Sequence, residues 1–112
     1  MSSQQILVQV IYPTSAAATF NMEYYLNNHI PLVKKRWGPQ GLQSCSVITG
    51  TKEAAYHVQA TMIWKDMASF ENVKGVEEVR EDIKNFTNVA PYRWVGLVAY
   101  QEVLTESETK EV

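Results

Sequence analysis

Apolar residues alternate along several short stretches of this chain, and these stretches predict strands. Residues 5–12 carry apolar side chains on both alternating sides, which is typical of a central strand covered on two faces. Residues 42–49 and 56–64 are also rich in alternating apolar residues, and the short loop around Gly50 predicts that they pair as an antiparallel hairpin. The last predicted strand covers residues 93–103.

A helical repeat of apolar positions begins at Met22, directly after Asn21, whose side-chain oxygen can accept a hydrogen bond from the first turn. His29 lies on the apolar stripe of this helix. Pro31 has no N–H to donate to the carbonyl oxygen of Asn27, and its ring crowds the same turn. We therefore expect a kink just after His29.

A second helical segment begins at Asp66 or Ser69, either of which can cap it, is interrupted at Gly75 and continues toward Phe86. The order of elements is then β-α-β-β-α-β, which is the order of the ferredoxin-like split βαβ unit. We predict an α+β fold with a four-stranded antiparallel sheet and two helices on one of its faces.

Two helices cover only one face of such a sheet, so the other face needs a different cover. A large exposed apolar face is rare on a monomer, so we expect a two-fold homodimer in which the apolar side of the strand at residues 56–64 meets the second subunit. The opposite assignment, with this apolar side under the helices, remains open. The apolar side consists of Tyr56, Val58, Ala60, Met62 and Trp64, and the more polar side of His57, Gln59, Thr61 and Ile63.

The chain has 112 residues, of which 46% are hydrophobic, and this is enough material for one domain with its own core. Its formal net charge is −2, and the acidic residues near the C-terminus account for this excess. The remainder has no surplus of Lys and Arg, so we expect no nucleic-acid partner. We divide the chain into a domain over residues 1–104 and a flexible acidic tail over residues 105–112.

Cys45 is the only cysteine, so the chain cannot form an intramolecular disulfide. The N-terminus lacks both the basic start and the long apolar stretch of a secretion signal. No apolar run approaches the roughly 18 residues that span a bilayer. These features predict a cytoplasmic protein with no membrane partner.

His29 is the strongest candidate for chemistry, since an imidazole on the inner face of a helix can exchange protons near neutral pH. Tyr25 precedes it by one turn and can orient its ring, while ordinary core packing remains the alternative for both residues. Two histidines and one cysteine without close spacing predict no metal site. Scattered glycines predict no nucleotide, and we expect no cofactor.

The segment FNMEYYLNNHIPLV at residues 20–33 is followed by WGP at residues 37–39, and DIKNFT stands at residues 82–87. These motifs closely resemble those of the EthD family, in the same order and over nearly the whole chain. The resemblance implies a dimeric α+β barrel in which His29 points into a pocket between the helices and the sheet, without metal or nucleotide. It also implies decarboxylase, dehydratase or cyclase activity less strongly than it implies the fold.

These features support two functions. The first is a cofactor-free lyase or cyclase that decarboxylates, dehydrates or cyclises a small aromatic, phenolic or polyketide-like compound, with His29 and Tyr25 as catalytic residues. The second is a non-catalytic protein that binds such a small hydrophobic molecule or supports a partner enzyme. We expect the more polar side of the strand at residues 56–64 to line the pocket, because a pocket needs a few polar groups. The predicted contacts to the small molecule come from Leu32, Trp37, His57, Gln59, Thr61 and Phe86.

Overall fold

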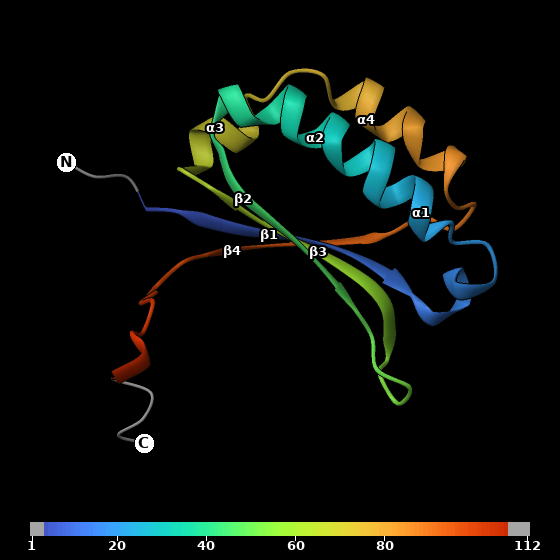
Figure 1. Ribbon diagram of the computed structural model, residues 1–112. Helices are drawn as coiled ribbons and strands as arrows, with labels where there is room; N and C mark the ends of the chain where they lie inside the picture. The colour runs from blue at the N-terminus through green and yellow to red at the C-terminus, as the bar shows by residue number, and fades with distance from the viewer. Residues whose placement is uncertain (1–3, 108–112) are drawn as a thin grey trace.

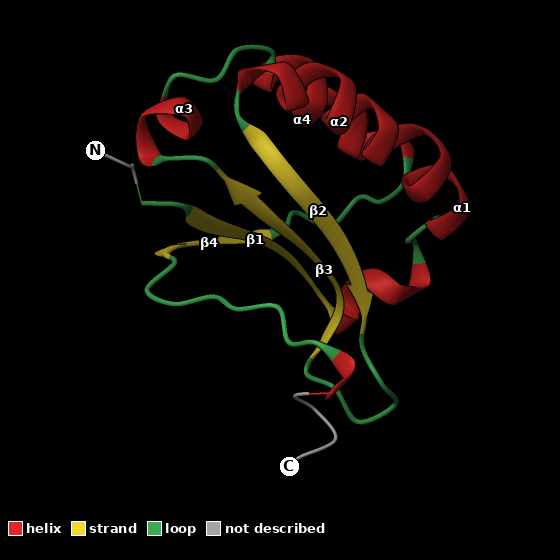
Figure 2. Cartoon of the chain, turned by 60° about the vertical axis from the view of Figure 1, so that its left-hand side comes forward, coloured by secondary structure: helices red, strands yellow, loops and turns green. Residues whose placement is uncertain are grey.

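Four strands form one antiparallel sheet in the order β2-β3-β1-β4, and the helices lie on one face of it (Figures 1 and 2). This is the architecture of a computed structural model that describes residues 4–107. The order βαββαβ and the predicted α+β ferredoxin-like fold are confirmed. The strands are β1 (Ile6–Pro13), β2 (Leu42–Thr49), β3 (Tyr56–Trp64) and β4 (Tyr92–Leu97). The helices are α1 (Met22–Tyr24), a π-helical turn (Tyr25–His29), α2 (Ile30–Trp37), α3 (Met67–Glu71) and α4 (Val76–Asp82), with short 3-10 turns at Thr14–Ala18, Gly38–Gln40 and Ile83–Asn85.

The last strand is shorter than the sequence pattern indicates. β4 ends at Leu97, which pairs with Ile6, the first residue of β1. One further backbone hydrogen bond joins the N–H of Val98 to the carbonyl oxygen of Gln5 at 2.9 Å. The predicted continuation to residue 103 is wrong, because β1 offers no strand residue before Ile6 with which the chain could pair.

The disturbance expected at Pro31 takes the form of a wide turn before it. Tyr25–His29 form one π-helical turn, which is closed by a hydrogen bond from the N–H of Ile30 to the carbonyl oxygen of Tyr25. The turn ends at His29, two residues before Pro31, which has no N–H to give to the preceding turn of the helix. Such π-turns are frequent at functional sites, and this one ends at His29.

Side-chain caps and one glycine set the boundaries of the helices. The Oδ1 of Asn21 accepts a hydrogen bond from the N–H of Tyr24 at 3.0 Å, as predicted. Of the two candidate caps for α3, the structure uses Asp66, whose Oδ1 accepts from the N–H of Ser69 at 2.8 Å. Gly75 separates α3 from α4 with a φ of 88°, a conformation that favours glycine.

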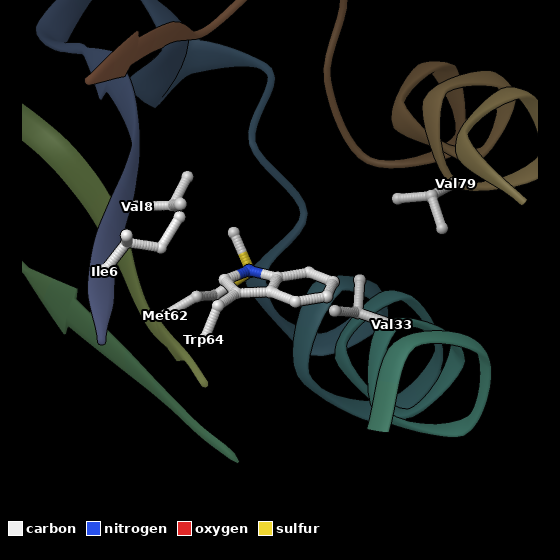
Figure 3. Packing of buried hydrophobic residues seen from close by; sticks show 6 residues of the cluster. All are labelled: Ile6, Val8, Val33, Met62, Trp64 and Val79. Carbon is white, nitrogen blue, oxygen red and sulfur yellow. The ribbon is translucent and has the colours of Figure 1, made fainter. Parts of the chain in front are cut away.

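The core lies between the sheet and the helices, and the apolar side of β3 faces into it. Val58 and Trp64 are fully buried, and Ala60 and Met62 are 4% and 5% exposed. Figure 3 shows Met62 and Trp64, together with Ile6 and Val8 of β1, pointing toward Val33 of α2 and Val79 of α4. The expectation that this side of β3 meets a second subunit is therefore wrong. The helices already cover it, which removes its apolar area from water.

None of the helices α1 to α4 covers the opposite face of the sheet; the chain after β4, with a short helical stretch at residues 106–107, runs on that side (Figure 2). Tyr92 and Trp94 of β4 pair with Ile11 and Gln9 and share this outer face with them. Their side chains are 62% and 56% exposed. Among residues 4–107, no helix is long and apolar enough to cross a membrane. Residues 108–112 of the predicted tail lie outside the described residues.

Candidate functional site

A mostly apolar cavity of about 180 Å³ lies between the helices and the inner face of the sheet. Its floor includes Ala60 and Met62 of β3, and its helical wall includes Val33 and Val79. His29 lines the same cavity. A cavity of this size is comparable to the roughly 150 Å³ that holds a benzene-sized molecule.

The imidazole of His29 is held by a carboxylate from the other helical segment. Its Nδ1 lies 2.9 Å from the Oδ2 of Asp82, the last residue of α4. The two side chains are 7% and 14% exposed, so water screens their interaction little. His29 was predicted from the sequence, whereas its partner Asp82 was not.

Two further groups hold the carboxylate of Asp82. The hydroxyl of Tyr24 donates to its Oδ1 at 2.6 Å, and the side-chain amide of Asn85 donates to the same oxygen at 3.0 Å. Desolvation raises the pKa of Asp82, but the hydrogen bonds from Tyr24, Asn85 and His29 outweigh it and bring the pKa below its ordinary value. Asp82 is therefore ionised at neutral pH and accepts every hydrogen bond that reaches it.

Burial lowers the pKa of His29 below its ordinary value of 6.5, and the hydrogen bond and charge of Asp82 only partly oppose this effect. The imidazole is therefore mainly neutral at pH 7. Because Asp82 is an acceptor only, the single ring proton sits on Nδ1 and donates to the carboxylate. The other nitrogen, Nε2, has no hydrogen-bond partner within residues 4–107 and can act as a base, and His29 lines the cavity.

Two aromatic side chains fix the plane of the imidazole. The ring of Tyr25 stacks on it at a centroid distance of 5.5 Å and an interplanar angle of 17°. Phe86 packs on it at 4.6 Å and also contacts Tyr25 at 4.8 Å. Phe86 is 2% exposed and does not line the cavity. These contacts leave His29 little freedom to rotate away from Asp82.

Two buried tyrosines, Tyr12 and Tyr25, also line the cavity. Burial raises the pKa of each phenol far above its ordinary value, and the proximity of Tyr12 and Cys45 adds to the effect on Tyr25. Both phenols are therefore protonated. Within the described residues neither hydroxyl has a hydrogen-bond partner, so each can donate to a bound molecule.

The remaining residues predicted on the helical side of the site are divided between cavity and core. Trp37 lines the cavity, and its Nε1 donates to the carbonyl oxygen of Lys74 at 3.2 Å. Leu32 is half-buried against the core around Ile6 and Val8 and does not line the cavity.

The three residues predicted from β3 lie elsewhere. Gln59 and Thr61 alternate with the buried positions of β3 and lie on the outer face. The ring of His57 packs against Phe20 at a centroid distance of 5.5 Å. None of the three lines the cavity, so the expectation that the polar side of β3 forms its wall is wrong. The polar groups of this cavity come from the helical segments, from Tyr12 of β1, from Cys45 of β2 and from Arg93 of β4, which leaves the inner side of β3 free to be apolar.

Asp82, Arg80 and Arg93 are among the polar residues of this region that were not predicted from the sequence. Asp82 is the first residue of the family-like motif at residues 82–87, and Asn85 stands one turn after it on the same helical segment. That spacing was the available signal for a polar cluster. Arg80 and Arg93 line the cavity but carry no local signal.

Within residues 4–107 no cluster of three or more His, Cys, Asp or Glu side chains could hold a metal ion. Cys45 is half-buried on β2 and lines the cavity. Burial raises the pKa of its thiol. The thiol is therefore protonated at neutral pH and is a poor nucleophile.

Solved structures that share this architecture include the following three. An EthD-like protein from Ralstonia eutropha JMP134 is 25% identical, with a TM-score of 0.74 over 89% of this chain and 96% of that chain. A dimeric ferredoxin-like protein from an uncultured marine organism is 13% identical, with a TM-score of 0.60 over 92% and 94%. A variant of SnoaB, a cofactor-independent oxygenase from Streptomyces nogalater, is 14% identical, with a TM-score of 0.57 over 94% and 100%. No family model and no curated protein matches the sequence.

The resemblance to the EthD family, first indicated by the motifs around His29 and Asp82, is confirmed by the first of these structures. The other two show that the same fold occurs in a protein described as dimeric and in a cofactor-independent enzyme.

Proposed function

We propose that this chain is a cofactor-free acid–base enzyme, a lyase or cyclase that acts on a small aromatic, phenolic or polyketide-like compound. One observation carries the proposal. A buried, neutral His29 is oriented by the carboxylate of Asp82 and leaves Nε2 free beside an apolar cavity. A free imidazole base with a fixed tautomer is the arrangement that proton abstraction near neutral pH requires.

The proton moves between Nε2 of His29 and the substrate. Nε2 accepts a proton from an activated carbon or a phenolic oxygen, and the resulting imidazolium is stabilised by the ionised Asp82 at 2.9 Å. In a dehydration the C–O bond breaks and the imidazolium returns the proton to the departing hydroxyl, which leaves as water. In a cyclisation the new C–C or C–O bond forms at a carbonyl carbon, and the proton goes to the carbonyl oxygen. In a decarboxylation the bond to the carboxylate breaks, CO₂ leaves, and the imidazolium protonates the carbanion. Asp82 keeps its own charge throughout, because the hydroxyl of Tyr24 and the amide of Asn85 stabilise the carboxylate.

Tyr25 serves this reaction in two ways. Its ring stacks on the imidazole and holds the ring plane. Tyr25 also lines the cavity, and its protonated hydroxyl can donate to a carbonyl or phenolate oxygen on which charge develops in the transition state.

The proposed active unit is a homodimer formed through the outer face of the sheet. Tyr92 and Trp94 expose large aromatic surfaces there, and after β4 the chain runs away from the helices (Figure 1). A second copy, related by two-fold symmetry, would cover this face. A structural neighbour is described as dimeric, which supports this assembly.

Replacing His29 by Asn tests the catalytic role. We expect kcat on a panel of phenolic and β-keto compounds to fall by about 10²- to 10⁴-fold while circular dichroism stays unchanged, because Asn keeps polarity but removes titration. The other histidine provides a matched control, since His57 does not line the cavity and H57N should keep turnover.

The same experiment separates catalysis from binding alone. If the wild type turns over none of the panel but binds one compound tightly, the protein is a binding module in which His29 orients the ligand. Near-normal turnover of H29N would contradict the catalytic role. Assays run in air and under nitrogen show whether turnover needs dioxygen, as in the oxygenase that shares the fold.

A further inference from the structure

The charged groups that line the cavity are all basic. Arg80 of α4 and Arg93 of β4 line it together with His29, and among the described residues no Asp or Glu does so. The whole chain holds 12 acidic against 10 basic residues, so a cavity wall with two arginines and no carboxylate does not follow from composition. The two arginines of the wall can therefore bind an anion.

Arg93 is the cation best placed to take such an anion. It pairs with Val10 in the sheet, which places it on the inner face, and its Cζ lies 5.5 Å from the ring centroid of Phe70. Within residues 4–107 the guanidinium has no ion-pair partner. The contact with Phe70 uses one face of the guanidinium and leaves its N–H edge free for a ligand.

Arg80 has only a weak ion-pair partner. Its Nη1 lies 2.8 Å from the Oε1 of Glu77, but the two side chains are 63% and 81% exposed. Exposed pairs of this kind contribute little, so a ligand can displace Glu77 at small cost. Because Arg80 and Arg93 are exposed while His29 is buried, the two arginines mark the mouth of the cavity and His29 its interior.

One further cation lies close to the mouth. A shallow hollow outside it shares Arg80, Ile83 and Pro91 with the cavity and adds Lys84. The Nζ of Lys84 lies 3.1 Å from the Oε2 of Glu81, again with both side chains exposed. Lys84 does not line the cavity itself and therefore offers a control of equal charge.

We propose that the substrate is a carboxylic acid with a body the size of a single aromatic ring, and that Arg93, assisted by Arg80, binds its carboxylate at the mouth of the cavity. The guanidinium fork matches the planar carboxylate and can donate two parallel hydrogen bonds. The apolar interior of about 180 Å³ accepts the ring and brings its far end toward Nε2 of His29. This inference deepens the proposed function, since it names the substrate class of that site, but the binding it describes does not depend on turnover.

Titration calorimetry with two matched probes tests the inference on the full chain. The probes are 2,4-dihydroxybenzoate and its methyl ester, which differ in the negative charge and by one methyl group. We expect the wild type to bind the acid about tenfold to a hundredfold more tightly than the ester, as charge-assisted hydrogen bonds permit. The preference should weaken with added salt.

Substitutions of the basic residues show which side chains cause the preference for the acid. Arg93→Gln should bring the ratio of the dissociation constants of ester and acid close to one. Arg93→Lys should keep part of the preference for the acid, because the point charge of an ammonium group replaces the guanidinium fork. Arg80→Gln should reduce the ratio, and Lys84→Gln should leave it unchanged. Equal binding of the two probes by the wild type, an unchanged ratio in a folded Arg93→Gln variant, or failure of the acid to bind at millimolar concentration would overturn the inference.

His29→Asn separates this inference from the proposed function. In that variant the ratio between acid and ester should persist, because the carboxylate contacts lie at the mouth. Loss of turnover with a persistent ratio supports both proposals. If the wild type prefers neutral compounds and His29→Asn loses turnover, the acid–base function stands and the proposal of a carboxylate substrate is rejected.

Discussion

The Nδ1 of His29 lies 2.9 Å from the Oδ2 of Asp82, although 53 positions separate the two residues along the chain. His29 ends the π-turn before α2, and Asp82 ends α4. The contact therefore ties together the two helical segments that cover the sheet. It also selects one imidazole tautomer, since an ionised carboxylate can only accept.

Asp82→Asn should impair catalysis without removing the imidazole. The substitution removes the hydrogen bond and the charge that raise the pKa of His29, so this pKa should fall further. An amide can either donate to or accept from Nδ1, so the tautomer is no longer fixed, and kcat should fall by up to about 10⁴-fold. Steady-state kinetics and NMR titration of the imidazole measure both effects.

Tyr24→Phe is the matched control for that variant. It removes the donor 2.6 Å from Oδ1 of Asp82 and leaves the contact to His29 in place. Its effect on kcat should be much smaller. An equally large loss in both variants would show that the network matters for packing and not for the tautomer.

The rate at low substrate concentration should rise with pH through a pKa below 6.5. Burial favours neutral His29, and only the neutral form is a base. The profile of kcat/KM in the free enzyme reports this pKa. A rise centred above 6.5, or a fall with rising pH over the same range, would contradict the role of His29 as a base.

The free energy of unfolding should decrease as the solution is acidified, because the pKa values of His29 and Asp82 are both lowered in the folded state. The pKa of His29 in the folded state lies below its ordinary value of 6.5, so the stability it contributes is lost as pH falls from about 6.5 through the folded pKa. The pKa of Asp82 is likewise below its ordinary value of 3.8, which adds a second loss at lower pH. Urea unfolding at a series of pH values measures these losses, and Asp82→Asn should remove the second one.

Neighbouring residues of β3 distinguish its two faces. Ala60 lines the cavity, whereas Thr61 lies on the outer face. Ala60→Leu should block ligand binding by filling cavity volume, whereas Thr61→Leu should leave the dissociation constant within a few-fold. Calorimetry with one ligand on both variants measures this. A larger loss of binding in Thr61→Leu than in Ala60→Leu would indicate that the polar side of β3 lines the pocket.

Trp94→Lys should convert the proposed dimer to monomer. The side chain is 56% exposed in the single chain, so the substitution costs that chain little, but a charge would be buried in a two-fold contact. Light scattering gives the mass of the wild type and of the variant. A wild type with the mass of one chain at micromolar concentration would reject the dimer.

Gly41→Ala should destabilise the fold by about 1–3 kcal/mol, as a residue in a strained backbone conformation does. Gly41 has a φ of 126°, and an added Cβ would lie 2.8 Å from the Cβ of Ser69. Gly38→Ala is the control, because Gly38 has a φ of −52° and a Cβ there meets nothing within 4 Å. Thermal unfolding of both variants compares them, and equal melting temperatures would contradict the argument.

Local patterns were sufficient for most of the fold. The apolar alternation at residues 42–49 and 56–64 placed β2 and β3 at their observed limits, and Asn21 and Gly75 marked helix boundaries correctly. The end of β4 could not be read in the same way. A strand ends where its partner ends, and the partner β1 is set by pairing across the sheet and not by the residues of β4.

The residues of the candidate site also fall into those that local sequence patterns predict and those that only the tertiary structure places. By itself, the sequence determined that His29 would lie on the inner stripe of a helix beside Tyr25, because that placement needs only the helical period. Only the tertiary structure decided which side of β3 faces the helices, since alternation defines two sides without saying which is covered. It alone also brought Asp82 to Nδ1 and Arg93 to the cavity mouth, because hydrogen bonds and charges between distant segments depend on how the helices pack on the sheet.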